Sequence, residues 1–310
     1  MTHCDIDNLI HDEALRLGFS ACGFASVEDV DARVYTHWQR WIEQGKHADM
    51  QYMERHCDIR RNPQGLLPQA RTVISVALNY SPPEMLPREH PQFARYAYGE
   101  DYHTIMRDLL QQLVQFIQSL SPCDCRICCD TAPIFERYWA TKAGIGFIGR
   151  NSQLIIPHQG SYFFIGEILT TLALTPSTPL NINCGSCRRC IDACPMSAIA
   201  DDGSIDARRC ISCQTIENRG ELPKTVTEQL GRRIYGCDTC QEVCPHNRHT
   251  QPTAIKRLFP LPQLKELSYD RLKNLSKEEF DTIFRHSAVK RAKYAGLMRN
   301  WSALNPELFE

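Results

Sequence analysis

The fold of the second half of the chain is decided by one stretch, Cys184-Gly185-Ser186-Cys187-Arg188-Arg189-Cys190-Ile191-Asp192-Ala193-Cys194-Pro195. Three cysteines are each separated by two residues, and a CxxxCP ending follows. This is the spacing of the bacterial ferredoxin run, in which the fourth cysteine ligates the other of two iron–sulfur clusters. Thiolates suit such centres because iron–sulfur clusters take soft, anionic ligands. The run therefore predicts a bacterial-ferredoxin-like region.

A second, shorter run completes the ligand count, because Cys237, Cys240 and Cys244-Pro245 repeat the pattern with one cysteine fewer. The missing ligand must come from Cys210 or Cys213. Zinc would explain one CxxC pair facing another, but not two CxxxCP endings with exchanged ligands. We therefore predict two [4Fe–4S] clusters. Cluster one takes Cys184, Cys187, Cys190 and Cys244, and cluster two takes Cys194, Cys237, Cys240 and one of Cys210 or Cys213.

The composition favours an intracellular redox protein. The chain has 310 residues, 16 cysteines and a formal net charge of −1, so nothing global attracts it to nucleic acid. The start of the chain has no basic and apolar leader, and the longest apolar stretch, 162–174, contains Glu167 and is too short to span a bilayer. We expect a cytoplasmic monomer without a membrane segment. Clustered cysteines in a reducing compartment usually hold metal or carry out redox chemistry.

Proline-rich boundaries divide the chain into three predicted regions, 1–178, 179–250 and 251–310. The first region is expected to be α/β, the second carries the clusters, and the third is helical. Apolar spacing predicts helices over 6–17, 105–120 and 134–143, and strands over 71–80, 153–156 and 162–174 with a turn at 158–160. Ser276 and Glu279 form a capping-box pattern in the tail.

The first region offers candidate proton-handling groups. Asp130 follows a strand-like run, Cys125 to Cys129, where an acid or base is often placed, although a helix cap is the commoner role. Asp101 and His103 flank Tyr102 at a predicted helix start, where Asp101 would be the capping residue and His103 a candidate proton carrier.

Two further patterns in this region have simpler interpretations. The GxGxxG spacing at 144–149 follows a helix rather than a strand. We therefore expect a loop that approaches a large cofactor closely instead of a dinucleotide site. The cysteines of the CxCxxCC pattern fit no common cluster, so we expect buried structural thiols at Cys123, Cys125, Cys128 and Cys129.

Several motifs together resemble the epoxyqueuosine reductase family, the cobalamin-dependent enzymes of tRNA modification. The resemblance covers nearly the whole chain and is carried by Arg60-Arg61-Asn62-Pro63, Asp101-Tyr102-His103, Asp130-Thr131-Ala132-Pro133, Gly144-Ile145-Gly146-Phe147-Ile148-Gly149-Arg150-Asn151-Ser152, Arg208-Arg209-Cys210, Gly236-Cys237-Asp238-Thr239-Cys240 and Ser287-Ala288-Val289-Lys290-Arg291.

This resemblance implies a fold, a cofactor and a reaction. The fold would be an α+β cobalamin-binding domain, a two-cluster domain and a short α-helical, HEAT-like tail. The reaction would be reduction of epoxyqueuosine to queuosine at the wobble position of tRNA, with Asp130 as proton donor and Cys210 as the cluster-two ligand. Base-off cobalamin would lie between the first two domains, near Arg60, Tyr102, His103, Asp130, Arg150, Asn151, Ser152, Met196 and Arg209.

The chemistry gives Asp130 a specific task. Removing the epoxide oxygen takes two electrons and two protons, and that oxygen leaves poorly unless it is protonated. We expect Asp130 to serve as the acid if burial raises its pKa. Electrons would come from an external low-potential donor, and the tail cations Lys290, Arg291, Lys293 and Arg299 would bind the phosphates of the tRNA anticodon stem-loop.

Two other functions are compatible with the clusters. A reductive dehalogenase relative would also combine cobalamin with two clusters, but it would have no use for a basic tail. A pure electron-transfer protein would bind no corrin and would not need Asp130.

Overall fold

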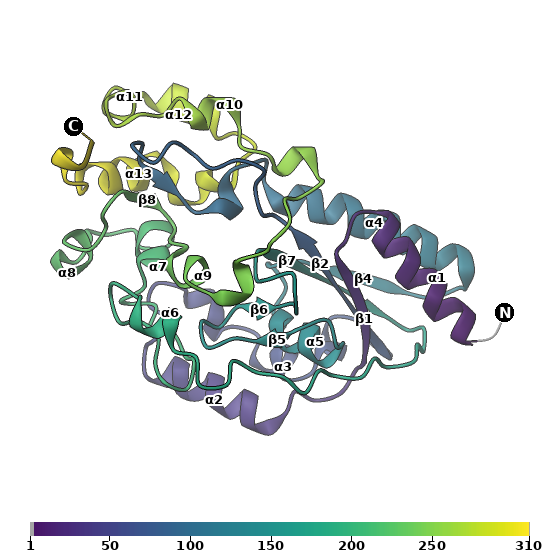
Figure 1. The fold of residues 1–310 in the computed structure, drawn as a ribbon. Coiled ribbons are helices and arrows are strands. Elements are labelled where there is room, and N and C mark those ends of the chain that lie inside the picture. Colours follow the sequence, from purple (N-terminus) through teal and green to yellow (C-terminus); the bar gives the residue numbers. More distant parts are fainter. Residues whose placement is uncertain (1–2, 310) are drawn as a thin grey trace.

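The computed structural model describes residues 3–309 and is built around a four-stranded antiparallel sheet in the order β1-β2-β7-β4 (Figure 1). Strands β2 and β7 pair along their whole length, from Thr72 opposite Thr170 to Asn79 opposite Phe163. Both are almost fully buried, which explains why the predicted strand 71–80 has a nearly continuous apolar sequence. The strands of this sheet are β1 (Ala21–Ser26), β2 (Thr72–Asn79), β4 (Cys125–Cys128) and β7 (Phe163–Thr170).

Helices cover both faces of the sheet. On one face lie α1 (His3–Arg16) and α4 (Tyr102–Leu120), whose apolar sides share a core with Ile74 and Ile168. On the other face lies α5 (Glu136–Lys142), whose Trp139 packs with Val73 and Leu169. The predicted helices at 6–17, 105–120 and 134–143 are thus confirmed, with α5 two residues shorter at its start.

The α5 face continues toward the cluster region through α2 (Ala32–Glu43) and α3 (Cys57–Arg61). The indole Nε1 of Trp41, near the end of α2, donates a hydrogen bond to the Ile205 carbonyl at 2.7 Å. The backbone N–H of Ala207 likewise bonds the Lys46 carbonyl at 2.8 Å. The segment after α2 is therefore fastened to the cluster region.

The predicted strand 153–156 is present only as β6 (Leu154–Ile155), and its partner is β5 (Phe147–Ile148) rather than β7. The predicted turn that follows is confirmed: His158 and Gly160 have φ values of 63° and 89°, and the Gly160 N–H bonds the Ile156 carbonyl. This turn lets the chain reverse direction before β7.

The cluster region contains short helices and one strand, as expected for a fold held by metal clusters. The strand β8 pairs in parallel with β3 from the first region. One hydrophobic core at this end takes residues from all three predicted regions, including Tyr98, Tyr235 and Leu297. The elements are β3 (Gln92–Phe93), α6 (Arg189–Asp192), α7 (Ile211–Ile216), α8 (Lys224–Thr227), β8 (Arg233–Tyr235) and α9 (Thr239–Glu242).

The tail is helical, as predicted, and it folds back over the cluster region (Figure 1). The capping box is present: Ser276 Oγ accepts from the Glu279 N–H at 3.1 Å, and Glu279 Oε2 accepts from the Ser276 N–H at 2.9 Å. Within residues 3–309, no helix is long and apolar enough to cross a membrane. The tail helices are α10 (Pro262–Lys265), α11 (Tyr269–Lys273), α12 (Lys277–Ile283) and α13 (Lys293–Ser302).

Candidate functional site

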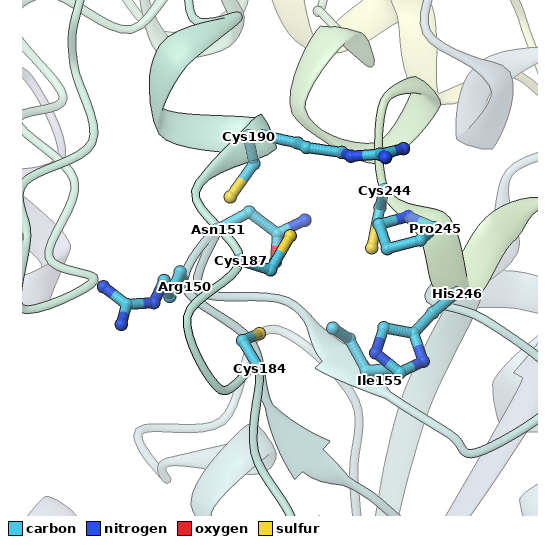
Figure 2. A pocket seen from close by; sticks show the side chains of 10 residues that line it. Arg150, Asn151, Ile155, Cys184, Cys187, Cys190, Cys244, Pro245 and His246 are labelled. Atoms are coloured by element: carbon cyan, nitrogen blue, oxygen red, sulfur yellow. The ribbon is translucent and has the colours of Figure 1, made fainter.

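The thiols assigned to cluster one surround a single cavity. Figure 2 shows Cys184 and Cys187 on the loop before α6, Cys190 in α6 itself, and Cys244 facing them from the turn after α9. Burial, and next the neighbouring Cys184 thiolate, raise the pKa of Cys190. Four thiols around one cavity are the donor set that a [4Fe–4S] cluster takes. The set is Cys184, Cys187, Cys190 and Cys244.

The thiols assigned to cluster two lie deeper in the protein. Burial raises the pKa of Cys240, and the nearby Cys237 and Cys210 thiolates raise it further. The pKa of Cys210 is raised by burial and by Cys237 and Cys194. Cys210 thus lies near Cys194, Cys237 and Cys240, the three other thiols assigned to cluster two.

The structure favours Cys210 over Cys213 as the remaining ligand. Cys210 caps α7 and is close to the other ligands, whereas Cys213 lies within the helix. Burial raises the pKa of Cys213 to about 12, and its charged neighbours are Cys210, Glu217 and Asp49. None of the three other cluster-two cysteines is among those neighbours.

A second group of side chains lies at the end of β4 and is centred on Asp130. This residue has a left-handed backbone (φ 58°), and its Oδ2 atom is 3.0 Å from His103 Nε2. The other ring nitrogen of His103, Nδ1, is 2.7 Å from Asp101 Oδ1. The Asp101 carboxylate also accepts from the His103 N–H and so caps α4, as predicted. Tyr102 stacks on His103 with ring centroids 4.1 Å apart.

Hydrogen bonding decides the protonation of this pair. Burial lowers the pKa of His103, but its hydrogen bonds to Asp101 and Asp130 outweigh burial and raise the pKa to about 9. Burial raises the pKa of Asp130, but the His103 hydrogen bond and charge outweigh it, so the pKa lies below its usual value. The condition set for Asp130 as the acid, a pKa raised by burial, is therefore not met by Asp130 alone, because His103 outweighs the effect of burial. At neutral pH the proton of the pair is on His103.

Two groups near Asp130 were missed by sequence reasoning. Glu136, the first residue of α5, accepts a short hydrogen bond from the Asp130 backbone N–H. Tyr52 is 44% exposed, and its pKa is raised to about 12 by burial and then by Glu217 and Asp130. The only sequence signal for Glu136 was its place six residues after Asp130, and Tyr52 gave no signal.

The residues expected near cobalamin are not all in one place. Tyr102, His103 and Asp130 are together, as described above. The buried Arg60 donates to the carbonyls of Tyr52 and Arg55 at 3.2 Å, so it shapes the loop that carries Tyr52. The other expected residues lie in the cluster region or at its border: Met196 is buried in the core there, and Arg209 is exposed on the turn before α7.

The loop 150–152 joins the first region to the cluster region. The Arg150 guanidinium donates to the Gly185 carbonyl at 3.1 Å, Asn151 Nδ2 donates to the Cys240 carbonyl at 3.4 Å, and Ser152 Oγ donates to the Gly203 carbonyl at 2.5 Å. These side chains therefore hold the backbone around both clusters.

The glycine-rich loop packs closely against other segments of the chain. A Cβ on Gly144 would lie 2.6 Å from the Thr178 carbonyl oxygen, and one on Gly146 would lie 2.6 Å from that of Ile155. A side chain at either position would collide with these carbonyls. The glycines therefore let two backbone segments pack closely, which explains why glycine is needed here.

The tail cations differ in their surroundings. Lys290 Nζ is 3.8 Å from Asp101 Oδ2, and Arg291 forms an ion pair with Glu217 at 2.7 Å and lies over the Tyr52 ring. Lys293 is exposed at the start of α13. The Arg299 guanidinium instead donates to the carbonyls of Asn218 and Gly220 at 2.8 and 2.7 Å. Two of the four cations are thus next to the Asp130 group.

The CxCxxCC cysteines belong to the sheet and its border. Cys128 and Cys129 are buried, and the Sγ atoms of Cys123 and Cys125 are 3.8 Å apart. Burial raises the pKa values of Cys125 and Cys128 to about 12, which keeps both as neutral thiols at physiological pH. Cys128 and Cys129 are thus buried as predicted, whereas Cys123 and Cys125 are only half-buried at the border of the sheet.

The geometry defines a redox protein with two ferredoxin-type cluster sites and an acid–histidine pair. Comparisons with known proteins agree. Residues 60–131 match the family described as epoxyqueuosine reductase QueG, DUF1730, and residues 183–247 match the 4Fe-4S double cluster binding domain. The cluster region thus binds two [4Fe–4S] clusters.

Full-length relatives identify the family. The chain is 38% identical to an epoxyqueuosine reductase of Cellulophaga algicola over 94% of this chain and 96% of the relative. It is 37% identical to an epoxyqueuosine reductase of Pseudomonas aeruginosa, over 94% of this chain and 82% of the relative. An epoxyqueuosine reductase structure with an epoxyqueuosine-modified tRNA-Tyr stem loop matches with a TM-score of 0.89 and 30% identity, covering 97% of this chain and 81% of that one. The chain belongs to the epoxyqueuosine reductase family of oxidoreductases.

One further solved structure bears on the Asp130 loop. It is an epoxyqueuosine reductase from Bacillus subtilis in which the loop of a catalytic aspartate is swung out of the active site. It matches with a TM-score of 0.90 and 29% identity over 97% of this chain and 81% of that one. Family membership decides against the dehalogenase and pure electron-carrier alternatives.

Proposed function

We propose that this chain reduces epoxyqueuosine to queuosine at the wobble position of tRNA, with Asp130 as the proton donor. The observation that carries the proposal is the contact between Asp130 and His103, which lie in the first region but share one folded unit with the cluster region. The reaction consumes two electrons and two protons and releases water. An external low-potential donor would supply the electrons through the clusters.

The residues around Asp130 fit a large redox cofactor. Tyr52 is exposed beside Asp130, and Cys213 of α7 is among the groups that raise its pKa, so Tyr52 faces the α7 side of the cluster region. A cofactor bound here would lie between the iron–sulfur clusters, which supply electrons, and Asp130, the proposed acid. We therefore propose base-off cobalamin against the Tyr52 loop, Tyr102 and the cluster region. When bound, cobalamin supplies a strongly reducing cobalt centre for opening the epoxide.

The chain's own contribution is proton transfer and positioning. His103 holds a proton at neutral pH and shares a hydrogen bond with Asp130, so Asp130 can receive this proton and deliver it to the leaving oxygen. The Asp101 carboxylate stabilises the imidazolium and fixes the ring. Arg60 holds the backbone at Tyr52 in place by donating a hydrogen bond to its carbonyl. A general acid of this kind contributes ~10²–10⁴-fold to the rate.

The proposed substrate contacts involve the tail. Lys290 and Arg291 lie at the Asp130 side of the tail, where they could meet backbone phosphates of an anticodon loop whose wobble base enters the site. The exposed Lys293 extends this cationic segment. Arg299 is less suited to bind phosphate than Lys290 or Arg291, because its guanidinium N–H groups already donate to backbone carbonyls.

The test combines spectra with turnover. Anaerobically purified protein should show a broad iron–sulfur band and should retain corrin bands through desalting after cobalamin is added. The loaded protein should convert epoxyqueuosine-containing tRNA, and Asp130→Asn should lose at least about 100-fold in turnover with unchanged clusters and cobalamin. Near-full activity of Asp130→Asn would exclude it as the acid.

A further inference from the structure

A carboxyl group without a structural partner lies in the middle of the central sheet. Glu167 on β7 is 0% exposed, and neither of its side-chain oxygens has a hydrogen-bond partner in the described part of the chain. The residues opposite it are Ser75 on β2 and Cys128 on β4, and the Ser75 hydroxyl also has no partner. An apolar residue would be the stable choice at this position.

The face of the sheet on which Glu167 lies is fixed by strand alternation. Glu167 is two residues from Leu169, which packs with Cys128 and Trp139 beneath α5. Glu167 therefore points toward α5, which packs on β7. The first residue of α5 is Glu136, whose Oε1 atom accepts the backbone N–H of Asp130. The buried carboxyl is thus connected through α5 to the proton donor.

The surroundings of Glu167 and Glu136 raise the pKa of both side chains and so favour their protonated forms. Burial, and next the charge of Glu136, raise the pKa of Glu167 well above its usual value. Burial and then Asp130 raise the pKa of Glu136 to about 7, while Arg137 and His103 oppose the shift. Their other titratable neighbours, Cys128 and Cys129, are neutral thiols with raised pKa values.

The reaction needs a second proton that the Asp130–His103 pair does not hold. We propose that Glu167 and Glu136 form a proton store behind Asp130, which provides the second of the two protons consumed in each reductive turnover. This inference rests on the function proposed above. The first proton passes from the His103–Asp130 pair to the leaving oxygen. The second passes from Glu136 to the Asp130 carboxylate and from there to the departing hydroxide, which leaves as water. Because no hydrogen bond joins the two glutamates, Glu167 reprotonates Glu136 through a water molecule, and solvent then refills the store.

An infrared measurement tests the store independently of turnover. A protonated carboxylic acid has a C=O stretching band that shifts in D2O and disappears when the group ionises. The wild-type protein at pH 7 should show a buried band of this kind, and Glu167→Gln should remove the part of it that Glu167 contributes. The exposed Glu228→Gln, on the far side of the cluster region, is the control and should leave the band unchanged. A band of unchanged intensity in Glu167→Gln overturns the proposal.

Turnover of the loaded enzyme tests the coupling. Glu167→Gln, which cannot deliver a proton, should lower kcat about tenfold at pH 8.5 and less at pH 6, where solvent protons are plentiful, with KM for tRNA unchanged. Glu167→Asp should recover part of the loss. Glu136→Gln, at a partly exposed position, should show the same pH pattern and provides a second variant if Glu167→Gln folds poorly. If both Gln variants keep the wild-type kcat across this pH range, the proposal is overturned.

The two experiments separate this inference from the function itself. If the wild-type protein does not convert epoxyqueuosine-containing tRNA, the proposed function fails, whatever the infrared result. If the wild-type protein is active and the Glu167 band is present but the Gln variants keep full kcat, the store is not used and the proposed function stands.

Discussion

His103 Nε2 lies 3.0 Å from Asp130 Oδ2, while the opposite nitrogen of the same ring lies 2.7 Å from Asp101 Oδ1. One imidazole therefore links two carboxylates, one that caps α4 and one that ends β4. The ring has a hydrogen-bond partner on each side, so its protonated form is favoured. If Asp130 is the acid, as proposed, the protonation of His103 rather than that of Asp130 alone would control proton delivery.

The first prediction concerns the pH dependence of activity and stability. Because the pKa of His103 is raised to about 9, turnover should fall as pH rises through about 9 in the wild-type protein. His103→Gln should lower turnover at pH 7 and remove this alkaline limb. The matched control is His11→Gln, on an exposed part of α1.

The linked stability change has a definite sign. The pKa of His103 is higher in the folded than in the unfolded chain, so its stabilising effect is complete below about 6.5 and is lost as pH rises through about 9. Denaturant midpoints of the wild type and His103→Gln should therefore converge between these pH values. If the difference between the two denaturant midpoints stayed constant up to pH 10, the raised pKa of His103 would be contradicted.

The second prediction distinguishes Cys210 from Cys213. Cys210 is close to Cys237 and Cys194, whereas Cys213 is inside α7. Cys210→Ala should lose cluster two and retain about half of the iron, because one of two [4Fe–4S] clusters remains. Cys213→Ala should keep full iron content and an unchanged electron paramagnetic resonance spectrum. Iron loss in Cys213→Ala with none in Cys210→Ala would reverse the assignment.

The sequence predicts most of the framework for clear physical reasons. Both cluster runs have fixed ligand spacing, and the long elements α1, β2 and α4 have strong apolar patterns. The Asp101 cap and the strand before Asp130 were also predicted. These features depend on local sequence, which is why they can be recognised without a structure.

The parts that could not be predicted depend on distant contacts. The pKa of Asp130 is set by His103, 27 residues earlier, and the store residue Glu167 interrupts an apolar strand without any motif. The glycines at 144–146 do match a known spacing, but their true neighbours, Thr178 and Ile155, are found only in the fold. A local pattern cannot show which segment packs against it.

The third prediction concerns tRNA affinity. Lys290→Glu should weaken binding of a tRNA anticodon stem-loop and reduce the slope of log affinity against log salt by about 1, because one phosphate contact is lost. Lys224→Glu is the control, since its side chain is 89% exposed on α8. Cluster content should be unchanged in both. Equal affinity and salt slope for Lys290→Glu and the wild type would remove Lys290 from the interface.

The fourth prediction tests how tightly α5, and with it Glu136, is held against the sheet. A Cβ on Gly23 of β1 would lie 2.0 Å from the backbone carbonyl oxygen of Ala143, directly after α5. Neither backbone can move without disturbing the sheet or α5, so Gly23→Ala should lower the free energy of unfolding by ~1–3 kcal/mol. The measurement is a denaturant midpoint with an unchanged m-value.

The matched control for this variant is Gly296→Ala in α13, where the nearest atom, Ala292 Cβ, would be 3.6 Å from the new Cβ. That substitution should be neutral or stabilising by up to ~1 kcal/mol, because alanine is the better helix former. Gly23→Ala should also reduce turnover, since a displaced α5 moves Glu136 away from the Asp130 N–H. If Gly23→Ala kept wild-type stability, the close approach of β1 and α5 would not exist, and the rigid support inferred for Glu136 would be lost with it.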